Sequence, residues 1–210
     1  MRNTKVRDLI LLAILGAWGI VLRFIDFPIF PPAPFLKFDF SDLMALIGLL
    51  IKGPVGLMTV AFIRDFGNFL IKGGQNMIPI GAIMSWLSTV VMFMPAHWLL
   101  KHSGLRQSWK HKLTMGVGLI VGLTGVMSVL NYFVALPLYV KVMNFPIDNY
   151  LAYVMTVIIP FNALKGFIIA LLQPLVIDKL PPRLVERDIL HADYMGGSNT
   201  ISWAPSHVVK

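Results

Sequence analysis

The stretch VIIPFNALKGFIIALL, residues 157 to 172, decides what kind of fold this chain can adopt. It is apolar enough for the interior of a membrane-spanning helix, yet it contains Pro160, Asn162 and Lys165. An ionisable side chain within a span costs about 2.5–3.5 kcal/mol on insertion scales, so such residues usually face the interior of the helix bundle and mark a site. The stretch therefore predicts a membrane helix with one polar, ligand-facing side.

Similar apolar runs recur along the whole chain of 210 residues, of which 57% are hydrophobic and 13% are charged. Soluble domains carry about 25% charged residues. We therefore predict an all-α integral membrane protein. The absence of cysteine from the sequence excludes disulfides and thiolate metal sites.

The apolar runs predict six transmembrane helices, because a span needs about 20 mainly apolar residues. The candidates are residues 8–25, 42–52, 54–71, 77–100, 112–141 and 153–178. The second and third are short and separated at Gly53-Pro54, a strong helix break. They form either a hairpin of half-length helices or one broken span, and we predict the hairpin because the charge pattern then agrees with six spans. Residues 1–180 form the membrane domain, and residues 181–210 form a mobile or peripheral cytoplasmic tail.

The distribution of basic residues predicts that both termini lie in the cytoplasm. The cytoplasmic segments then hold Arg2, Lys5, Arg7, Lys52, Lys101, Arg106, Lys110, Lys112, Lys179, Arg183 and Arg187. The outer segments keep only Arg23, Lys37, Lys72 and Lys141. This asymmetry follows the positive-inside rule, and it accounts for the net charge of +8 without a nucleic-acid partner.

The polar groups of the last span lie on one helix face. Asn162 and Lys165 are three positions apart and therefore neighbours on that face. Pro160 has no N–H, so it cannot bond to the carbonyl of Thr156, which leaves that oxygen free near the same level. The face offers an amide, an ammonium and a carbonyl to whatever it meets.

The preceding span repeats this device in the stretch LNYFVALPLYV, residues 130–140. Asn131 is followed by Pro137, which releases the carbonyl of Phe133. Asn131, Ala135 and Tyr139 share a helix face, with the small Ala135 leaving room between larger groups.

Two amides, an ammonium and nearby aromatic rings suit a flat heterocycle with a polar rim. An Asn amide presents a donor beside an acceptor, which matches the C=O and N–H edge of an imide ring. Aromatic side chains cover the faces of such a ring. The alternative is structural, since Asn residues in spans also hold helices together by hydrogen bonds.

Two further segments carry candidate site residues. Arg64, Asp65 and Asn68 lie in one apolar run, where an ion pair or a packing role is at least as plausible as ligand contact. The outer loop DFPIFPPAPFLKFDFSD, residues 26–42, contains four prolines and many phenylalanines. It is either an aromatic segment at the membrane interface or a lid over an outward-facing pocket.

The sequence shows no motif for catalysis or nucleotide hydrolysis. It contains no G-x-x-x-x-G-K-[ST] loop for nucleotide phosphates, no evident nucleophile–base pair and no acidic cluster at a membrane face. We therefore expect no enzyme, no cofactor and no metal site. A membrane enzyme acting on lipids and a structural or assembly protein remain the alternatives to a ligand binder.

The paired motifs LNYFVALPLYV and IIPFNALKGFIIALL resemble the riboflavin-specific substrate-binding subunit (S component) of energy-coupling factor (ECF) transporters. The loop PPAPFLKFDFSDLMALIG, the break KGPVG and the helix-1 motif AILGA are also similar to that family, so the resemblance covers most of residues 5–180. It implies a six-helix protein of the cell membrane that captures riboflavin from outside. It also implies a transmembrane T component and two cytoplasmic ATPase subunits as partners.

The resemblance also assigns residues. It implies that Asn131, Asn162 and Lys165 contact the flavin ring and that the Phe-rich loop closes the pocket. Phe38, Asp42 and Asn68 complete the predicted substrate-binding set. Ala13 and Ala17 are predicted to dock on the T component. Flavin mononucleotide stays an alternative ligand, since basic residues near the outer mouth could meet a phosphate.

Overall fold

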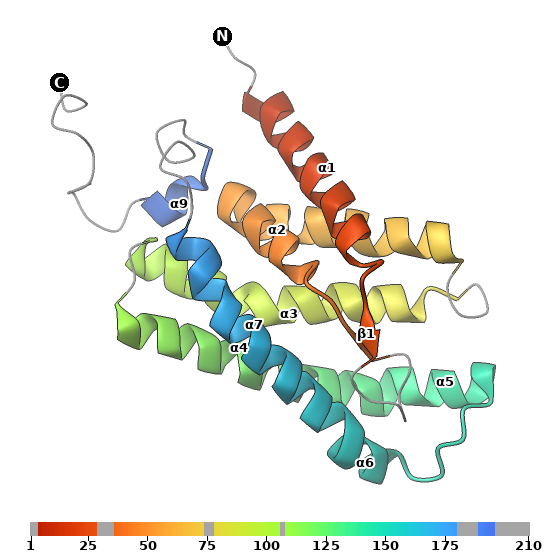
Figure 1. Cartoon of the computed structure of the whole chain (residues 1–210). Helices are drawn as coiled ribbons and strands as arrows, with labels where there is room; N and C mark the ends of the chain where they lie inside the picture. The colour runs from red at the N-terminus through yellow and green to blue at the C-terminus, as the bar shows by residue number, and fades with distance from the viewer. Residues whose placement is uncertain (1–3, 29–35, 74–77, 106–107, 180–188, 196–210) are drawn as a thin grey trace, which may run out of the picture.

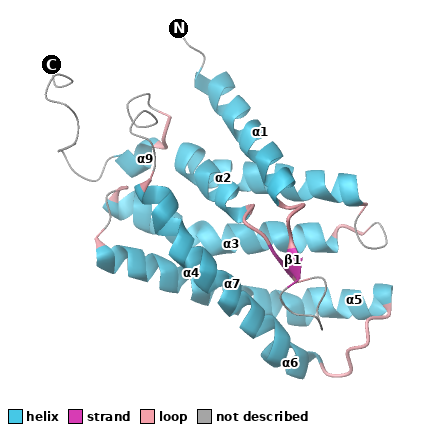
Figure 2. Ribbon diagram, viewed as in Figure 1, coloured by secondary structure: helices cyan, strands magenta, loops and turns pink. Residues whose placement is uncertain are grey.

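The computed structural model describes residues 4–28, 36–73, 78–105, 108–179 and 189–195, and almost all of these are helical (Figures 1 and 2). The helices are α1 Thr4–Leu22, α2 Asp42–Lys72, α3 Ile80–Ser103, α4 Trp109–Leu130, α5 Leu136–Met143, α6 Tyr150–Tyr153, α7 Ile159–Asp178 and α9 Ala192–Met195. Two π-helical turns, η1 Asn131–Ala135 and η2 Val154–Ile158, join α4 to α5 and α6 to α7.

Within the described residues, four helical runs are long and apolar enough to cross a membrane: 42–72, 80–103, 109–142 and 150–178. The last three agree with the predicted spans to within a few residues. Their outward faces carry large apolar side chains, such as Phe133 at 69% exposed. A surface of this kind is unfavourable in water and suits contact with lipid.

Helix α2 is sharply broken and doubles back on itself. Lys52 and Gly53 have non-helical backbone angles, and Gly53 has a φ of 63°, in the left-handed region that favours glycine. Gly48 and Gly56 touch, because a Cβ built on Gly56 would lie 2.1 Å from the Gly48 carbonyl oxygen. Eight residues of straight helix would separate them by about 12 Å. The predicted break at Gly53-Pro54 is therefore confirmed, and α2 consists of a first half, residues 42–52, and a second half, residues 54–72.

The first half of α2 contributes to the centre of the bundle, where Leu46, Leu49 and Leu50 are fully buried. The order of contacts between neighbouring helices is α1–α2–α3–α4–α7. Glycines allow α1 and α2 to approach closely, since Gly16 lies directly against Ile63. This packing places the two halves of α2 between α1 and the remaining helices.

One end of the bundle carries a small antiparallel ribbon, formed by β1 Phe27–Pro28 and β2 Lys37–Phe38. Figure 2 shows β1 as the magenta arrow at the end of the bundle away from α9. The ribbon brackets the predicted lid loop, whose middle, residues 29–35, lies outside the described part of the chain.

At the opposite end, part of the predicted tail packs against the bundle. The His191 backbone N–H donates to the carbonyl of Leu50 at 2.8 Å, and His97 Nδ1 lies 2.6 Å from the hydroxyl of Tyr194. Tyr194 is almost fully buried. Residues 189–195 therefore cover the turn between the halves of α2, whereas residues 181–188 and 196–210 lie outside the described chain.

Candidate ligand-binding site

A cavity of about 340 Å³ lies inside the bundle towards the end that carries the β ribbon. Its volume falls within the range of about 300–1,000 Å³ that is usual for ligand sites. Residues of α2, α3, η1, α5 and α7 line it, together with Arg23, Asp26 and Lys37 from the segments around the ribbon. The cavity is therefore built by residues that lie far apart in the sequence.

Four of the predicted substrate-binding residues meet in this cavity: Asn68, Asn131, Asn162 and Lys165. Asn131, Asn162 and Lys165 are buried. The Oδ1 atom of Asn68 is also buried and accepts no hydrogen bond from the described residues. The tertiary structure thus brings three amides and one ammonium to a single space.

The two π-turns shape the backbone around the Asn and Pro residues of each helix. Within η1, the N–H of Leu136 donates to the carbonyl of Asn131, five residues earlier. The same widened bond joins Ile159 to Val154 in η2. Pro137 and Pro160 follow these bonds directly, where their missing N–H breaks the regular α-helical pattern. Single π-turns of this kind are frequent at functional sites.

The buried amides bond to their own helices. Asn131 Nδ2 donates to the carbonyl of Met127 at 2.7 Å, and Asn162 Nδ2 donates to the carbonyl of Ile158 at 2.9 Å. Each bond uses one of the two N–H donors of an amide, so a second N–H and the amide oxygen remain to meet a ligand. These two bonds therefore do not join neighbouring helices, which is the structural alternative for Asn131 and Asn162.

Aromatic and hydroxyl side chains complete the wall. Phe69, Tyr139 and Phe161 supply ring surfaces, and Ser85 and Ser88 supply hydroxyl groups from α3. Sequence reasoning placed Tyr139 on the face of Asn131 but missed both serines. The signal was present in the stretch MSWLST, residues 84–89, because three hydroxyl residues in an apolar span are unusual.

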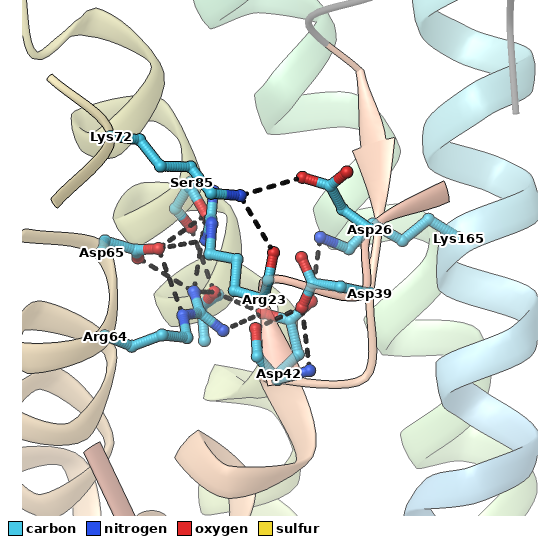
Figure 3. A network of polar contacts seen from close by, with 11 residues as sticks. Arg23, Asp26, Asp39, Asp42, Arg64, Asp65, Lys72, Ser85 and Lys165 are labelled. Carbon is cyan, nitrogen blue, oxygen red and sulfur yellow. Dashed lines mark hydrogen bonds and ion pairs between the residues drawn. The ribbon is translucent and has the colours of Figure 1, made fainter. Parts of the chain in front are cut away.

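Lys165 forms an ion pair at the base of the cavity. Its Nζ atom lies 2.9 Å from Oδ2 of Asp42, and Oδ1 of the same carboxylate accepts from Arg64 Nη1 at 2.6 Å. Figure 3 shows Lys165 reaching from α7 towards Asp42, with Arg64 on the other side of the carboxylate. All three groups are buried, so their charges are compensated inside the bundle.

The ion pairs continue from Arg64 towards the ribbon. Arg64 donates to both carboxylate oxygens of Asp65, at 3.1 and 2.9 Å. Arg23 contacts Asp65 and donates to the hydroxyl of Ser85, the latter at 2.7 Å. The ion-pair interpretation of Arg64 and Asp65 is therefore confirmed.

Two residues of the predicted substrate-binding set stand apart from the cavity wall. Phe38 lies on β2, is buried, and packs edge-to-face on Phe40 with ring centroids 5.3 Å apart. Asp42 lies behind Lys165 and is also absent from the lining. Direct contact of either residue with a ligand stays a prediction.

The outer rim of the cavity carries a second, more exposed set of charges. Asp26 Oδ2 lies 2.9 Å from Lys37 Nζ and 3.4 Å from Lys72 Nζ. Partial burial raises the pKa of Asp26, but the hydrogen bond and charge of Lys37, aided by Lys72, outweigh it and leave the pKa below its ordinary value. These ion pairs connect the end of α1, the ribbon and the end of α2.

The predicted docking residues lie on the outside of the bundle. Ala13 and Ala17 are exposed on α1, whereas Gly16 between them is buried against Ile63 of α2. The exposed face of α1 also carries the large side chain of Trp18. Ala13 and Ala17 thus form a shallow, small-residue strip between larger apolar groups.

An apolar helical bundle whose interior cavity presents amides, an ammonium and aromatic rings is a membrane-embedded ligand-binding protein. A family model described as "ECF transporter, substrate-specific component" matches residues 7–177. The chain belongs to this family and is a multi-pass membrane protein.

Named relatives and a solved structure agree with this assignment. The riboflavin transporter FmnP of Bacillus subtilis is 31% identical over 89% of this chain and 98% of its own length. The riboflavin transporter RibU of Staphylococcus aureus is 33% identical, covering 83% of this chain and 90% of its own. A solved S component of a bacterial ECF transporter superposes with a TM-score of 0.70 at 32% identity, over 86% of this chain and 98% of that chain.

Proposed function

We propose that this protein captures riboflavin from outside the cell and presents it to an ATP-driven ECF transport module. The observation that carries the proposal is the meeting of Asn68, Asn131, Asn162 and Lys165 in one cavity. The names of the relatives, which are riboflavin transporters, indicate the ligand. On this proposal the protein binds its ligand without transforming it.

The chemistry of the cavity fits an isoalloxazine ring. The imide edge of that ring alternates C=O and N–H groups, and an Asn amide pairs with such an edge through its own donor and acceptor. Lys165 donates to a ring carbonyl or nitrogen, and Phe69 and Phe161 cover the faces. Each hydrogen bond that the ammonium donates is worth about 1.5–3 kcal/mol.

We further propose six spans with both termini in the cytoplasm. The reversal at Lys52–Gly53 supports two separate passes for the halves of α2. Lys52 pairs with Asp8 near the start of α1 at 3.1 Å, at the end opposite the cavity mouth. The basic end then faces the cytoplasm, and the cavity opens outwards, as capture from outside requires.

The energy for transport comes from partner subunits on this proposal, because the sequence has no phosphate-binding loop. The partners are a transmembrane T component and two cytoplasmic ATPases. Ala13 and Ala17 contact the T component, because small exposed residues allow another membrane helix to approach closely.

The test is a binding measurement on the purified protein in mild detergent. Protein from cells grown in rich medium is expected to show flavin absorption bands, and riboflavin is expected to quench tryptophan fluorescence. Lys165→Met should weaken affinity by about tenfold to a hundredfold. A colourless protein whose fluorescence ignores riboflavin would contradict the proposal.

Flavin mononucleotide is the second ligand to titrate, because Lys37 and Lys72 carry positive charge at the cavity rim. Comparison of the two affinities decides which flavin is preferred. A lipid or an unrelated heterocycle of similar size serves as the negative control.

A further inference from the structure

Asp42 lies behind the cavity wall, and each of its carboxylate oxygens has a separate task. Oδ2 lies 2.9 Å from Lys165 Nζ. Oδ1 accepts from Arg64 Nη1 at 2.6 Å and from the hydroxyl of Thr89 at 2.7 Å. The carboxylate is therefore held on one side by α2 and α3, while its other side faces the ammonium of α7 (Figure 3).

Arg64 is fully buried and makes hydrogen bonds in several directions. Besides Asp42, it contacts both oxygens of Asp65, and its Nη2 atom donates to the Thr89 hydroxyl at 2.7 Å. Thr89 thus accepts from Arg64 and donates to Asp42, which fixes the orientation of both. The guanidinium cannot move without breaking several of these bonds.

Stability alone does not account for this network. Apolar residues of similar volume can often replace a buried ion pair without loss of stability. The position of the network does account for it. Of its members Asp42, Arg64, Thr89 and Lys165, only Lys165 lines the cavity. A lysine side chain is a point charge on a flexible four-carbon stem, so it needs an external anchor to present its donors in one direction.

We propose that Asp42 and Arg64 are positioning residues that hold the Lys165 ammonium at the base of the cavity for the ligand. Asp42 anchors the ammonium directly, and Arg64 and Thr89 lock Asp42. Neither Asp42 nor Arg64 lines the cavity, so both act through Lys165. This inference rests on the proposed function, since it concerns the same site, and it follows the general need of a binding group for rigid support behind it.

The first test compares riboflavin affinities of purified variants. Asp42→Asn keeps the shape but removes the counter-charge of Lys165, and we expect affinity to fall by about tenfold to a hundredfold. The matched control is Asp178→Asn, which breaks another lysine–aspartate pair, with Lys112 at 2.5 Å, at the far end of α7. The control should bind riboflavin as the wild type does.

Thr89→Val provides a variant that leaves every charge in place. It removes the hydroxyl that orients both Asp42 and Arg64, and we expect a loss of affinity of about two- to tenfold. Asp42→Glu restores the charge and should recover part of the affinity lost in Asp42→Asn. These variants keep the inference testable if Asp42→Asn does not fold.

A double-mutant cycle separates positioning from general structural damage. If Asp42 acts through Lys165, then Asp42→Asn should change affinity by less than about twofold in a Lys165→Met background. Asp42→Asn and Lys165→Met should also shift the flavin absorption bands in the same direction, because both disturb the hydrogen bond from the Lys165 ammonium to the flavin ring. Additive losses in the cycle would overturn the inference.

The outcomes separate the two proposals. A wild-type protein that binds riboflavin, with Asp42→Asn and Thr89→Val binding it equally well, refutes the positioning role and leaves the proposed function standing. A wild-type protein that does not bind riboflavin refutes the proposed function, and it also refutes the positioning role for a flavin.

Discussion

The Nη1 atom of Arg64 lies 2.6 Å from Oδ1 of Asp42, although 22 positions separate the two residues within α2. In a continuous helix they would be about 33 Å apart. The reversal at Lys52–Gly53 therefore creates the contact, and through it the support of Lys165. The helix break and the binding site are parts of one arrangement.

The first prediction concerns the contact that the reversal requires. Gly56→Ala places a methyl group 2.1 Å from the Gly48 carbonyl oxygen, a backbone atom that cannot move aside easily. We expect a loss of stability of about 1–3 kcal/mol and a weaker riboflavin affinity. Thermal unfolding in detergent, followed by fluorescence, measures the first effect.

The control for this variant is Gly125→Ala, because a Cβ at Gly125 meets nothing within 4 Å. Alanine is the better helix former, so this variant should unfold at the same temperature as the wild type or slightly higher. Equal behaviour of the two variants would show that the close approach of Gly48 and Gly56 is not needed.

The second prediction distinguishes ligand binding from helix association. Because Asn131 and Asn162 donate to carbonyls of their own helices, replacing both with alanine should leave the unfolding temperature of the ligand-free protein almost unchanged. Riboflavin affinity should fall by about tenfold or more. A double variant that fails to fold would support the structural role instead.

The third prediction concerns the exposed strip on α1. Ala13→Leu and Ala17→Leu fill the strip with larger side chains, so co-purification with a T component and riboflavin uptake by cells should both be lost. Riboflavin affinity of the isolated protein should stay the same, because neither residue lines the cavity. Val121→Leu, on an exposed face of α4, is the control and should leave uptake intact.

The fourth prediction follows from the lowered pKa of Asp26. The folded protein binds a proton at Asp26 less readily than the unfolded chain does. The ion pairs with Lys37 and Lys72 are therefore complete above the ordinary carboxyl pKa of about 3.9, and they are lost only as the pH falls through the lower pKa that Asp26 has in the folded protein.

Protonation of Asp26 breaks the ion pairs with Lys37 and Lys72 at the rim of the cavity. We therefore expect riboflavin to leave the wild-type protein about two- to fivefold faster once Asp26 is protonated. Stopped-flow fluorescence from about pH 6 down to below about pH 3 measures this step, because the lowered pKa of Asp26 places its protonation below the ordinary carboxyl value. Asp26→Asn should release riboflavin at the faster rate across the whole range. A variant that keeps the pH dependence of the wild type would assign it to another group.

Much of the site could be predicted from local sequence. Asn162 and Lys165 were expected on one face because helix periodicity places residues three apart side by side, and both line the cavity. Pro137 and Pro160 were expected to disturb their helices, and a π-turn precedes each. The structure added the wider turn itself, which a missing N–H permits but does not specify.

The serines of α3 show where local reasoning ends. Ser85 and Ser88 face the cavity, whereas their neighbour Thr89 contacts Asp42 and Arg64 behind it. The sequence holds all three hydroxyls within five positions. Which of them meets a ligand depends on how α3 is rotated against α2, and no local pattern determines that rotation.

The sequence by itself determined the membrane class, the break at Gly53 and the polar faces of the last two helices, because hydrophobicity, backbone freedom and helical period act over a few residues. Only the tertiary structure decided that Asp42 pairs with both Lys165 and Arg64, and that Ala13 faces outwards. These relationships join residues far apart in the chain. They depend on the packing of whole helices, in which each buried charge must find its partner.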